Sequence, residues 1–325
     1  MKNTVNSAEL AKIPFVDVEN VRGRVLSNTI FHDGRWRWWL AVGEPPQIQE
    51  LSIHSLGEGY YFGHRAANET DIMIPFLDFV AQHASFNEVL PAIGGLQDDV
   101  LNLAASVAKF PILHRSGLAN SRMVATEIEY LVTLCRSVFD LLQEALAALW
   151  ANVILADPSI KKRRLPASFR EVVMFKGVIA DAESTARRFG IPIEIAKCYA
   201  TCAGFFSALR TSRDNVVHGG SRVPAIFAQE DGWYIQEQLI SLPNVPIWRE
   251  SERLANGLVP LMPAIGAIIA CTLRCCDDFS SAFSGTIGLL PRLVPDMHYF
   301  VTSVHCPSLH VLLQDARVRM RDGLF

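Results

Sequence analysis

The amino-acid sequence predicts a mainly α-helical protein: a helical bundle with a small mixed α/β region at the N-terminus and an inserted β-hairpin. Apolar side chains recur with helical spacing through residues 121–216, and residues 255–273 carry no charged side chain. Strand and turn residues gather before residue 65 instead. A chain of 325 residues can form one large or two ordinary domains. We expect a mixed N-terminal region at 1–115, the bundle at 116–285, and a mixed C-terminal segment at 286–325 that packs on the bundle.

The composition indicates a globular chain without a broad polyanion-binding surface. Half of the residues are apolar and the formal net charge is −3, so any nucleic-acid site must be a local basic patch. Seven cysteines are too few for a disulfide scaffold, and several lie on expected helices, which favours buried reduced thiols. The N-terminal residues lack an apolar signal core, so we expect a cytoplasmic protein. Residues 255–273 approach the length of a membrane span, but Pro260 and Pro263 favour a buried core helix and no membrane partner.

The N-terminal region is expected to contain a β-hairpin and then helices. Residues 35–40 follow Asp33-Gly34, as the second strand of a hairpin would. Their alternating arginines and tryptophans could stack on bases and hold phosphates, but such strands more often pack their aromatics and expose their arginines. Residues 72–110 look mostly helical, with breaks at Pro75, Pro91 and Gly94-Gly95.

Three helices of the bundle follow from apolar stripes. The first begins near residue 121 and stops before Asp157-Pro158; its stripe is Val124, Ile128, Leu131, Cys135, Val138, Leu142, Ala145 and Leu149. The second begins with a capping box at 168–171 and ends before Gly190; its stripe is Val172, Phe175, Ile179, Ala182, Ala186 and Phe189. The third begins near Pro192 and ends at Gly219-Gly220; its stripe is Ile195, Tyr199, Cys202, Phe206, Leu209, Arg213 and Val216. Beyond it we expect a hairpin at 225–235, a fourth helix at about 251–283 and a short helix near 309–320.

The end of the third helix carries the most informative residues of the chain. Arg213 occupies a position where the repeat calls for an apolar side chain, so it must meet an anionic partner or a water-filled cleft. His218 lies in the last turn, where the helix dipole favours a protonated imidazole. A histidine can move a proton and an arginine can stabilise a charged phosphate. The alternative is structural, with Arg213 paired to a buried carboxylate and His218 capping the helix.

Residues 213–218 resemble the motif of the HEPN superfamily (higher eukaryotes and prokaryotes nucleotide-binding domain). That motif is an arginine, usually followed by Asn, Asp or His, with a histidine a few residues later; Arg213, Asp214 and His218 match it. HEPN domains are helical bundles, and many are metal-independent RNases of toxin–antitoxin, CRISPR and antiviral systems. One branch carries a modified tyrosine two residues after the histidine, but this chain has Gly220 there, so the resemblance does not extend to that regulation.

The resemblance implies a metal-independent endoribonuclease, which could act as a toxin or an antiviral defence effector. Its substrate would be RNA and not DNA, because the attacking group is the ribose 2′-hydroxyl. Arg213 and His218 would be catalytic, and Asp214 and Asn215 would orient the site unless they are ordinary surface polar residues. HEPN RNases pair two domains so that two motifs line one cleft, which implies a homodimer, and an antitoxin or regulatory protein is a possible partner. The alternative function is a noncatalytic HEPN-like scaffold that binds a nucleotide or a protein.

For each of the other candidate residues, a structural or solvent-exposed role is an alternative to the functional one. A basic loop could hold RNA phosphates or simply be solvated; it consists of Lys161, Lys162, Arg163 and Arg164. Arg136 and Asp140 could line the cleft, but their spacing favours an ion pair within one helix. We expect no cofactor and no metal site, because the late cysteines and histidines fit no standard zinc spacing; they are Cys271, Cys275, Cys276, His298, His305, Cys306 and His310.

Overall fold

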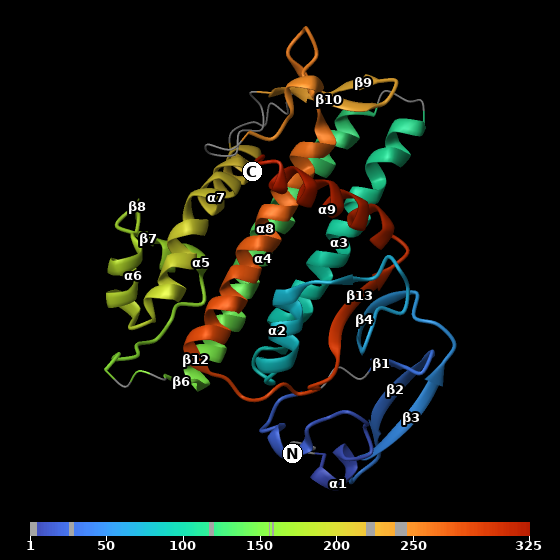
Figure 1. The fold of residues 1–325 in the computed structure, drawn as a ribbon, viewed down its shortest axis with the longest axis vertical. Coiled ribbons are helices and arrows are strands. Elements are labelled where there is room, and N and C mark those ends of the chain that lie inside the picture. Colours follow the sequence, from blue (N-terminus) through green and yellow to red (C-terminus); the bar gives the residue numbers. More distant parts are fainter. Residues whose placement is uncertain are drawn as a thin grey trace.

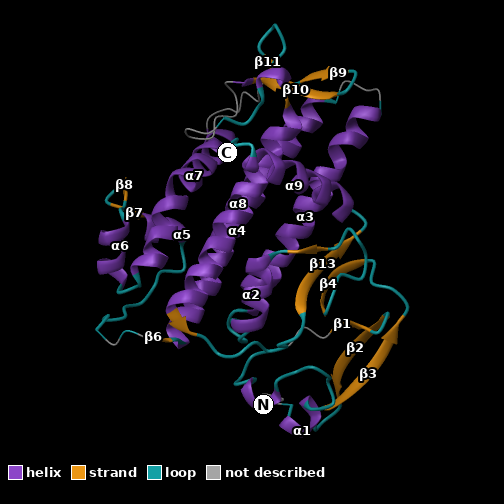
Figure 2. Ribbon diagram, in the orientation of Figure 1, coloured by secondary structure: helices purple, strands orange, loops and turns teal. Residues whose placement is uncertain are grey.

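The structure is a computed structural model, and it describes the chain except residues 1–4, 26–28, 117–119, 156, 158, 219–224 and 238–245. Helices make up 52% and strands 18% of it, so the protein is α/β and the expectation of a mainly α protein is wrong. Figures 1 and 2 show the long helices side by side, with the mixed sheet at the lower right of the view. The expected domain boundaries at 115 and 285 stay a prediction.

A six-stranded mixed sheet joins the two ends of the chain. Its order is β3-β2-β1-β4-β13-β5, with β1 at Thr29–His32, β2 at Arg35–Val42, β3 at Gln47–Ile53, β4 at Glu58–Gly63, β5 at Ile72–Met73 and β13 at His298–Ser303. β1 and β4 run parallel, whereas β13 pairs antiparallel with β4 along its whole length. The C-terminal strand therefore completes a sheet begun by N-terminal strands, which no local pattern in the sequence reveals.

The first predicted hairpin is confirmed. Asp33 and Gly34 both have positive φ, at 50° and 71°, and this turn joins β1 to β2. Trp39 is buried, and the ring of Trp36 packs 4.7 Å from that of Tyr61, centroid to centroid. Two aromatic side chains of β2 are therefore packed, which is the interpretation that the sequence favoured over base stacking. The chain before it contains the short helices α1 (Ser7–Leu10) and η1 (Val18–Asn20).

The helices of the bundle surround a continuous core. They are α2 (Pro75–His83), α3 (Leu90–Arg115), α4 (Ser121–Asn152), α7 (Ile193–His218), α8 (Leu261–Thr286) and α9 (Cys306–Arg321). α4 packs against α3, α7 and α8, and α8 also contacts α2 and α9. The predicted helix from 121 is thus confirmed. The expected break at Gly94-Gly95 is wrong, since α3 continues through it, and a Cβ at Gly95 would lie only 3.0 Å from Leu141 of α4.

The second predicted helix is interrupted. The structure has α5 (Phe169–Val173), a hairpin of β7 (Met174–Phe175) and β8 (Val178–Ile179), and α6 (Ala182–Phe189) instead. Lys176 and Gly177 both take positive φ, so they form a tight turn that a helix cannot contain. Ser168 makes no capping hydrogen bond, whereas Asp181 accepts one from the backbone N–H of Ser184 and starts α6.

The second predicted hairpin is confirmed as β9 (Phe227–Gln229) and β10 (Gly232–Gln236). The fourth helix begins later than expected, because residues 250–252 form a 3-10 helix (η3) and Leu258–Pro260 forms β11, which pairs with β10. β12 (Ile287–Gly288) pairs with β6 (Ile154–Leu155) at the other end of α8. Within the described part of the chain, no helix has both the length and the apolar character to cross a membrane. The uncharged segment instead opens α8, where most of its side chains are buried.

Candidate functional site

The helix α7 carries the predicted catalytic motif on its last two turns. Its apolar face is buried as predicted, with exposed fractions of 3% or less; its members are Ile195, Tyr199, Cys202, Phe206 and Leu209. The Tyr199 hydroxyl donates a hydrogen bond of 2.6 Å to Gln143 Oε1 of α4, which fixes this face against the bundle. Position 213 lies one turn beyond Leu209. The side chains of residues 212–218, including Arg213, Asp214, Asn215 and His218, lie outside the described part of the structure.

The backbone at the motif constrains how the two residues predicted to be catalytic can meet. α7 remains helical through His218. Five residues of α-helix turn by about 500°, so positions 213 and 218 lie about 140° apart around the helix axis. A site made by one chain would require the last turn to unwind. A site shared between two copies of the chain needs no such change.

The basic loop lies at the opposite end of α7. A Cβ at Gly190 would clash with the backbone oxygen of Lys161, so the loop lies against the residues that precede α7. From Ile193 to Arg213 the helix rises about 30 Å, at about 1.5 Å per residue. The structure therefore does not bring the basic loop and the motif to one phosphate within a single chain.

Two members of the basic loop have structural contacts. Lys162 Nζ donates hydrogen bonds to the carbonyl oxygens of Trp150 at 2.8 Å and Val153 at 2.9 Å, which closes the C-terminal end of α4. The guanidinium of Arg163 reaches the carbonyl oxygen of Arg188 at 3.3 Å. Lys161 and Arg164 are exposed. These two remain the better candidates for contact with a nucleic-acid backbone.

The pair on α4 confirms its structural interpretation. Arg136 Nη2 lies 2.8 Å from Asp140 Oδ2, as expected for residues four apart on one helix. The same guanidinium lies 5.6 Å from the ring centroid of Phe206 on α7. The ion pair therefore lies where α4 contacts α7. That contact is at Phe206, two turns before position 213 on α7.

The late cysteines and histidines do not form one cluster. Cys202 of α7 hydrogen-bonds with Cys275 of α8, and burial raises the pKa of Cys198 and of Cys271 to about 11, so both stay protonated at neutral pH. His298, in contrast, lies on β13, opposite Gly63. Among the described residues, no group of three or more His, Cys, Asp or Glu side chains is placed to hold a metal ion.

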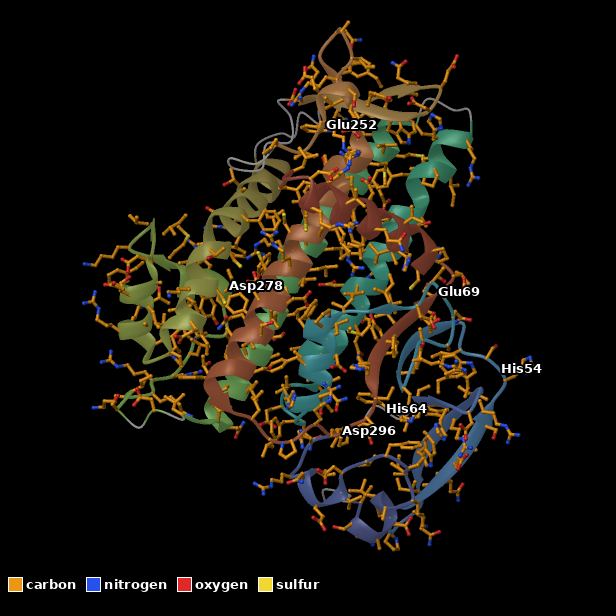
Figure 3. All side chains as sticks on the ribbon, viewed as in Figure 1. His54, His64, Glu69, Glu252, Asp278 and Asp296 are labelled. Carbon is orange, nitrogen blue, oxygen red and sulfur yellow. The ribbon has the colours of Figure 1, made fainter. Side chains whose placement is uncertain are left out.

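Sequence reasoning missed a pair of histidines at the end of the six-stranded sheet. The ring centroids of His32 and His64 lie 5.5 Å apart, and His64 is exposed (Figure 3). They follow from the parallel pairing of β1 with β4, which places the C-terminal ends of both strands together. The one local signal was His32 beside the Asp33-Gly34 turn, and it gave no reason to connect it with His64.

No family model matches the chain, and comparisons with curated proteins and with solved structures find no match. The resemblance at 213–218 therefore depends on the motif and on its place at the end of α7.

Proposed function

We propose that the protein is a metal-independent endoribonuclease of the HEPN type, acting as a homodimer. In each site, Arg213 of one protomer and His218 of the other act on one phosphate of the RNA. The observation that carries the proposal is the continuous helix through His218, which places the two motif positions about 140° apart. Two copies of α7 related by a two-fold axis can bring an arginine from one side and a histidine from the other.

The proposed reaction needs only groups that RNA and the motif supply. The ribose 2′-oxygen attacks the adjacent phosphorus in line with the 5′-oxygen that leaves. The 2′-hydroxyl loses its proton, the 5′-oxygen gains one, and the products are a 2′,3′-cyclic phosphate and a 5′-hydroxyl. His218 takes the proton of the 2′-hydroxyl as the new phosphorus–oxygen bond forms, and solvent water protonates the 5′-oxygen that leaves. Arg213 stabilises the charge that develops on the phosphate oxygens.

Neighbouring residues complete the proposal. Asp214 and Asn215, between the two reacting groups in sequence, would orient Arg213 and His218. Lys161 and Arg164, about 30 Å along α7, would contact a part of the RNA strand beyond the cleaved linkage. We place the protein in the cytoplasm as a toxin or antiviral defence effector, where an antitoxin or regulatory protein would keep it inactive.

An RNA-cleavage assay in EDTA tests the proposal. Purified protein is incubated with end-labelled RNA beside Arg213→Ala and His218→Ala, with Arg210→Ala as the control from the preceding turn of α7. Loss of a general acid–base group or of an oxyanion partner lowers a rate by about 100-fold or more. We expect wild type and Arg210→Ala to cleave, and 2′-deoxy substitution at the cleaved position to block cleavage. Equal cleavage by all variants contradicts the proposal, and RNA binding without any cleavage supports a noncatalytic scaffold instead.

A further inference from the structure

A second arrangement of proton-transfer groups lies at the end of the six-stranded sheet, on the part of the chain remote from α7 (Figure 1). His32 is the last residue of β1, and His64 follows the last residue of β4. These strands are parallel, with Phe31 opposite Gly63, so the two histidines leave the sheet at the same edge. Their rings lie 5.5 Å apart, centroid to centroid, with planes inclined at 65°. The side chain of His32 is 24% exposed and His64 is exposed, so a solvent-borne ligand can reach both.

The polar partners of the two rings leave a different nitrogen available on each ring. His64 Nδ1 lies 2.9 Å from the carbonyl oxygen of Asp296, which can only accept, so Nδ1 donates and Nε2 keeps a free lone pair (Figure 3). His32 Nε2 lies 3.0 Å from a carboxylate oxygen of Asp33, which favours a proton on Nε2 and leaves Nδ1 for a ligand. The pair thus combines an acceptor nitrogen on His64 with the imidazole of His32, which donates from Nδ1 when both of its nitrogens carry a proton.

Phe15 holds the two imidazoles together. Its ring centroid lies 4.5 Å from that of His32 and 5.2 Å from that of His64. Its backbone has a φ of 70°, a region that a bulky aromatic residue rarely adopts. Such a conformation is strained and persists where surrounding contacts impose it. Phe15 thus combines an uncommon backbone conformation with ring contacts to both histidines.

The surrounding charge fits a small anion better than a long polyanion. Arg35 lies directly opposite His32 in the β1–β2 register, so both side chains leave the same face of the sheet. No ion pair engages Arg35 within the described part of the chain. Residues 1–65, however, contain seven Lys and Arg against seven Asp and Glu, which provides no extended basic surface. One arginine on the same face of the sheet as the two imidazoles matches a single phosphate group.

We infer that the His32–His64 pair hydrolyses ribose 2′,3′-cyclic phosphates to 3′-phosphates. His64 Nε2 takes a proton from water as the water oxygen bonds to phosphorus. The bond from phosphorus to the 2′-oxygen breaks, and His32, which enters the step as the imidazolium, gives the proton on Nδ1 to that oxygen and becomes neutral. Arg35 balances the charge of the phosphate oxygens. The choice of a cyclic ester rests on the proposed function, since RNA cleavage by the 2′-hydroxyl leaves this end group; the assignment of the acid–base pair does not.

Hydrolysis of nucleoside 2′,3′-cyclic phosphates by the full-length protein in EDTA tests this inference separately from RNA cleavage. The variants are His32→Ala, His64→Ala and His64→Asn, whose amide can still donate to the Asp296 carbonyl but cannot transfer a proton. His54→Ala is the control, because His54 is exposed and lies apart from His64 (Figure 3). Thermal unfolding of each variant accompanies the rates.

We expect the wild type and His54→Ala to form 3′-phosphates, with rates at least about 100-fold lower in the three site variants. The double variant Arg213→Ala/His218→Ala should keep the wild-type rate on the cyclic substrates, even if it no longer cleaves RNA. Absence of hydrolysis by the wild type overturns the inference. Hydrolysis by a folded His64→Asn at the wild-type rate overturns it equally.

Discussion

Arg319 of α9 holds Glu252 of η3 in a two-pronged ion pair, with Nη1 2.8 Å from Oε2 and Nη2 bonded to Oε1. The side chain of Arg319 is 5% exposed, and its Nε also bonds to Asp315 on the same helix. The pair connects the last helix of the chain to the segment that leads into β11 and α8. It lies at the end of the bundle where Figure 3 labels Glu252.

Removing this ion pair should destabilise the protein in a pH-dependent way. The hydrogen bond from Arg319 lowers the pKa of Glu252 below its usual value. The folded-state pKa is thus below the unfolded one, so the stabilisation is present at neutral pH and is lost as the pH falls through the folded value. We expect Glu252→Gln to cost about 3 kcal/mol at pH 7, by urea unfolding, and progressively less as the pH falls through the folded-state pKa. Glu250→Gln is the control, because that side chain is 91% exposed. An effect of equal size in both variants would contradict the assignment.

Lys162 should stabilise the end of α4 rather than bind RNA. Its ammonium donates to three carbonyl oxygens there, and Lys162→Met removes all three hydrogen bonds. We expect a loss of about 1–2 kcal/mol in the free energy of unfolding. Arg164→Met, an exposed neighbour, should leave the stability unchanged and weaken RNA binding instead. Equal stability of the two variants would show that the cap is unimportant.

Gly190 should not tolerate a side chain. It ends α6 with a φ of 62°, and a Cβ there would clash with the backbone oxygen of Lys161. The left-handed conformation alone costs about 1–2 kcal/mol for alanine, and the clash adds to it. We expect Gly190→Ala to lower the melting temperature markedly. Gly204→Ala, inside α7 and with open space at its Cβ position, should be neutral or slightly stabilising. Similar melting temperatures for the two variants would contradict this packing.

Asp277 should destabilise the protein as the pH rises. Burial raises its pKa to about 7, although its Oδ1 accepts a hydrogen bond of 2.9 Å from the backbone N–H of Phe76. The folded carboxyl keeps a proton that the unfolded chain has lost, so stability falls as the pH rises between about 4 and about 7. We expect Asp277→Asn, which can still accept that hydrogen bond, to gain about 2 kcal/mol at pH 8 and little at pH 4. Asp278→Asn, exposed one residue later, is the control and should gain nothing.

Elements with a strong local period could be predicted from the sequence, and pairings between distant segments could not. The stripes of α4 and α7 repeat for many turns, and both helices form where the repeat places them. Asp33-Gly34 similarly identifies the β1–β2 hairpin. The sheet was underestimated because β13 joins β4 from the other end of the chain. The predicted second helix failed because Lys176-Gly177 forms a turn inside an apparent helical stripe.

The two candidate sites also differ in whether the sequence alone reveals them. The motif at Arg213 and His218 is local, because six consecutive residues of one helix contain it. His32 and His64 lie on different strands, and only the parallel pairing of β1 with β4 brings their rings to 5.5 Å. A histidine beside a turn gives no sign of a partner elsewhere in the chain. Tertiary structure is therefore needed to identify the pair.

A complementation experiment tests the shared RNase site most directly. Arg213→Ala and His218→Ala proteins, each inactive alone, are mixed at equal concentration, allowed to exchange subunits, and assayed on RNA in EDTA. Half of the dimers should then be mixed, and each mixed dimer contains one complete site and one empty one. The shared-site geometry predicts recovery to about a quarter of the wild-type rate. A mixture no more active than its separate components, once mass spectrometry has shown mixed dimers, would contradict it.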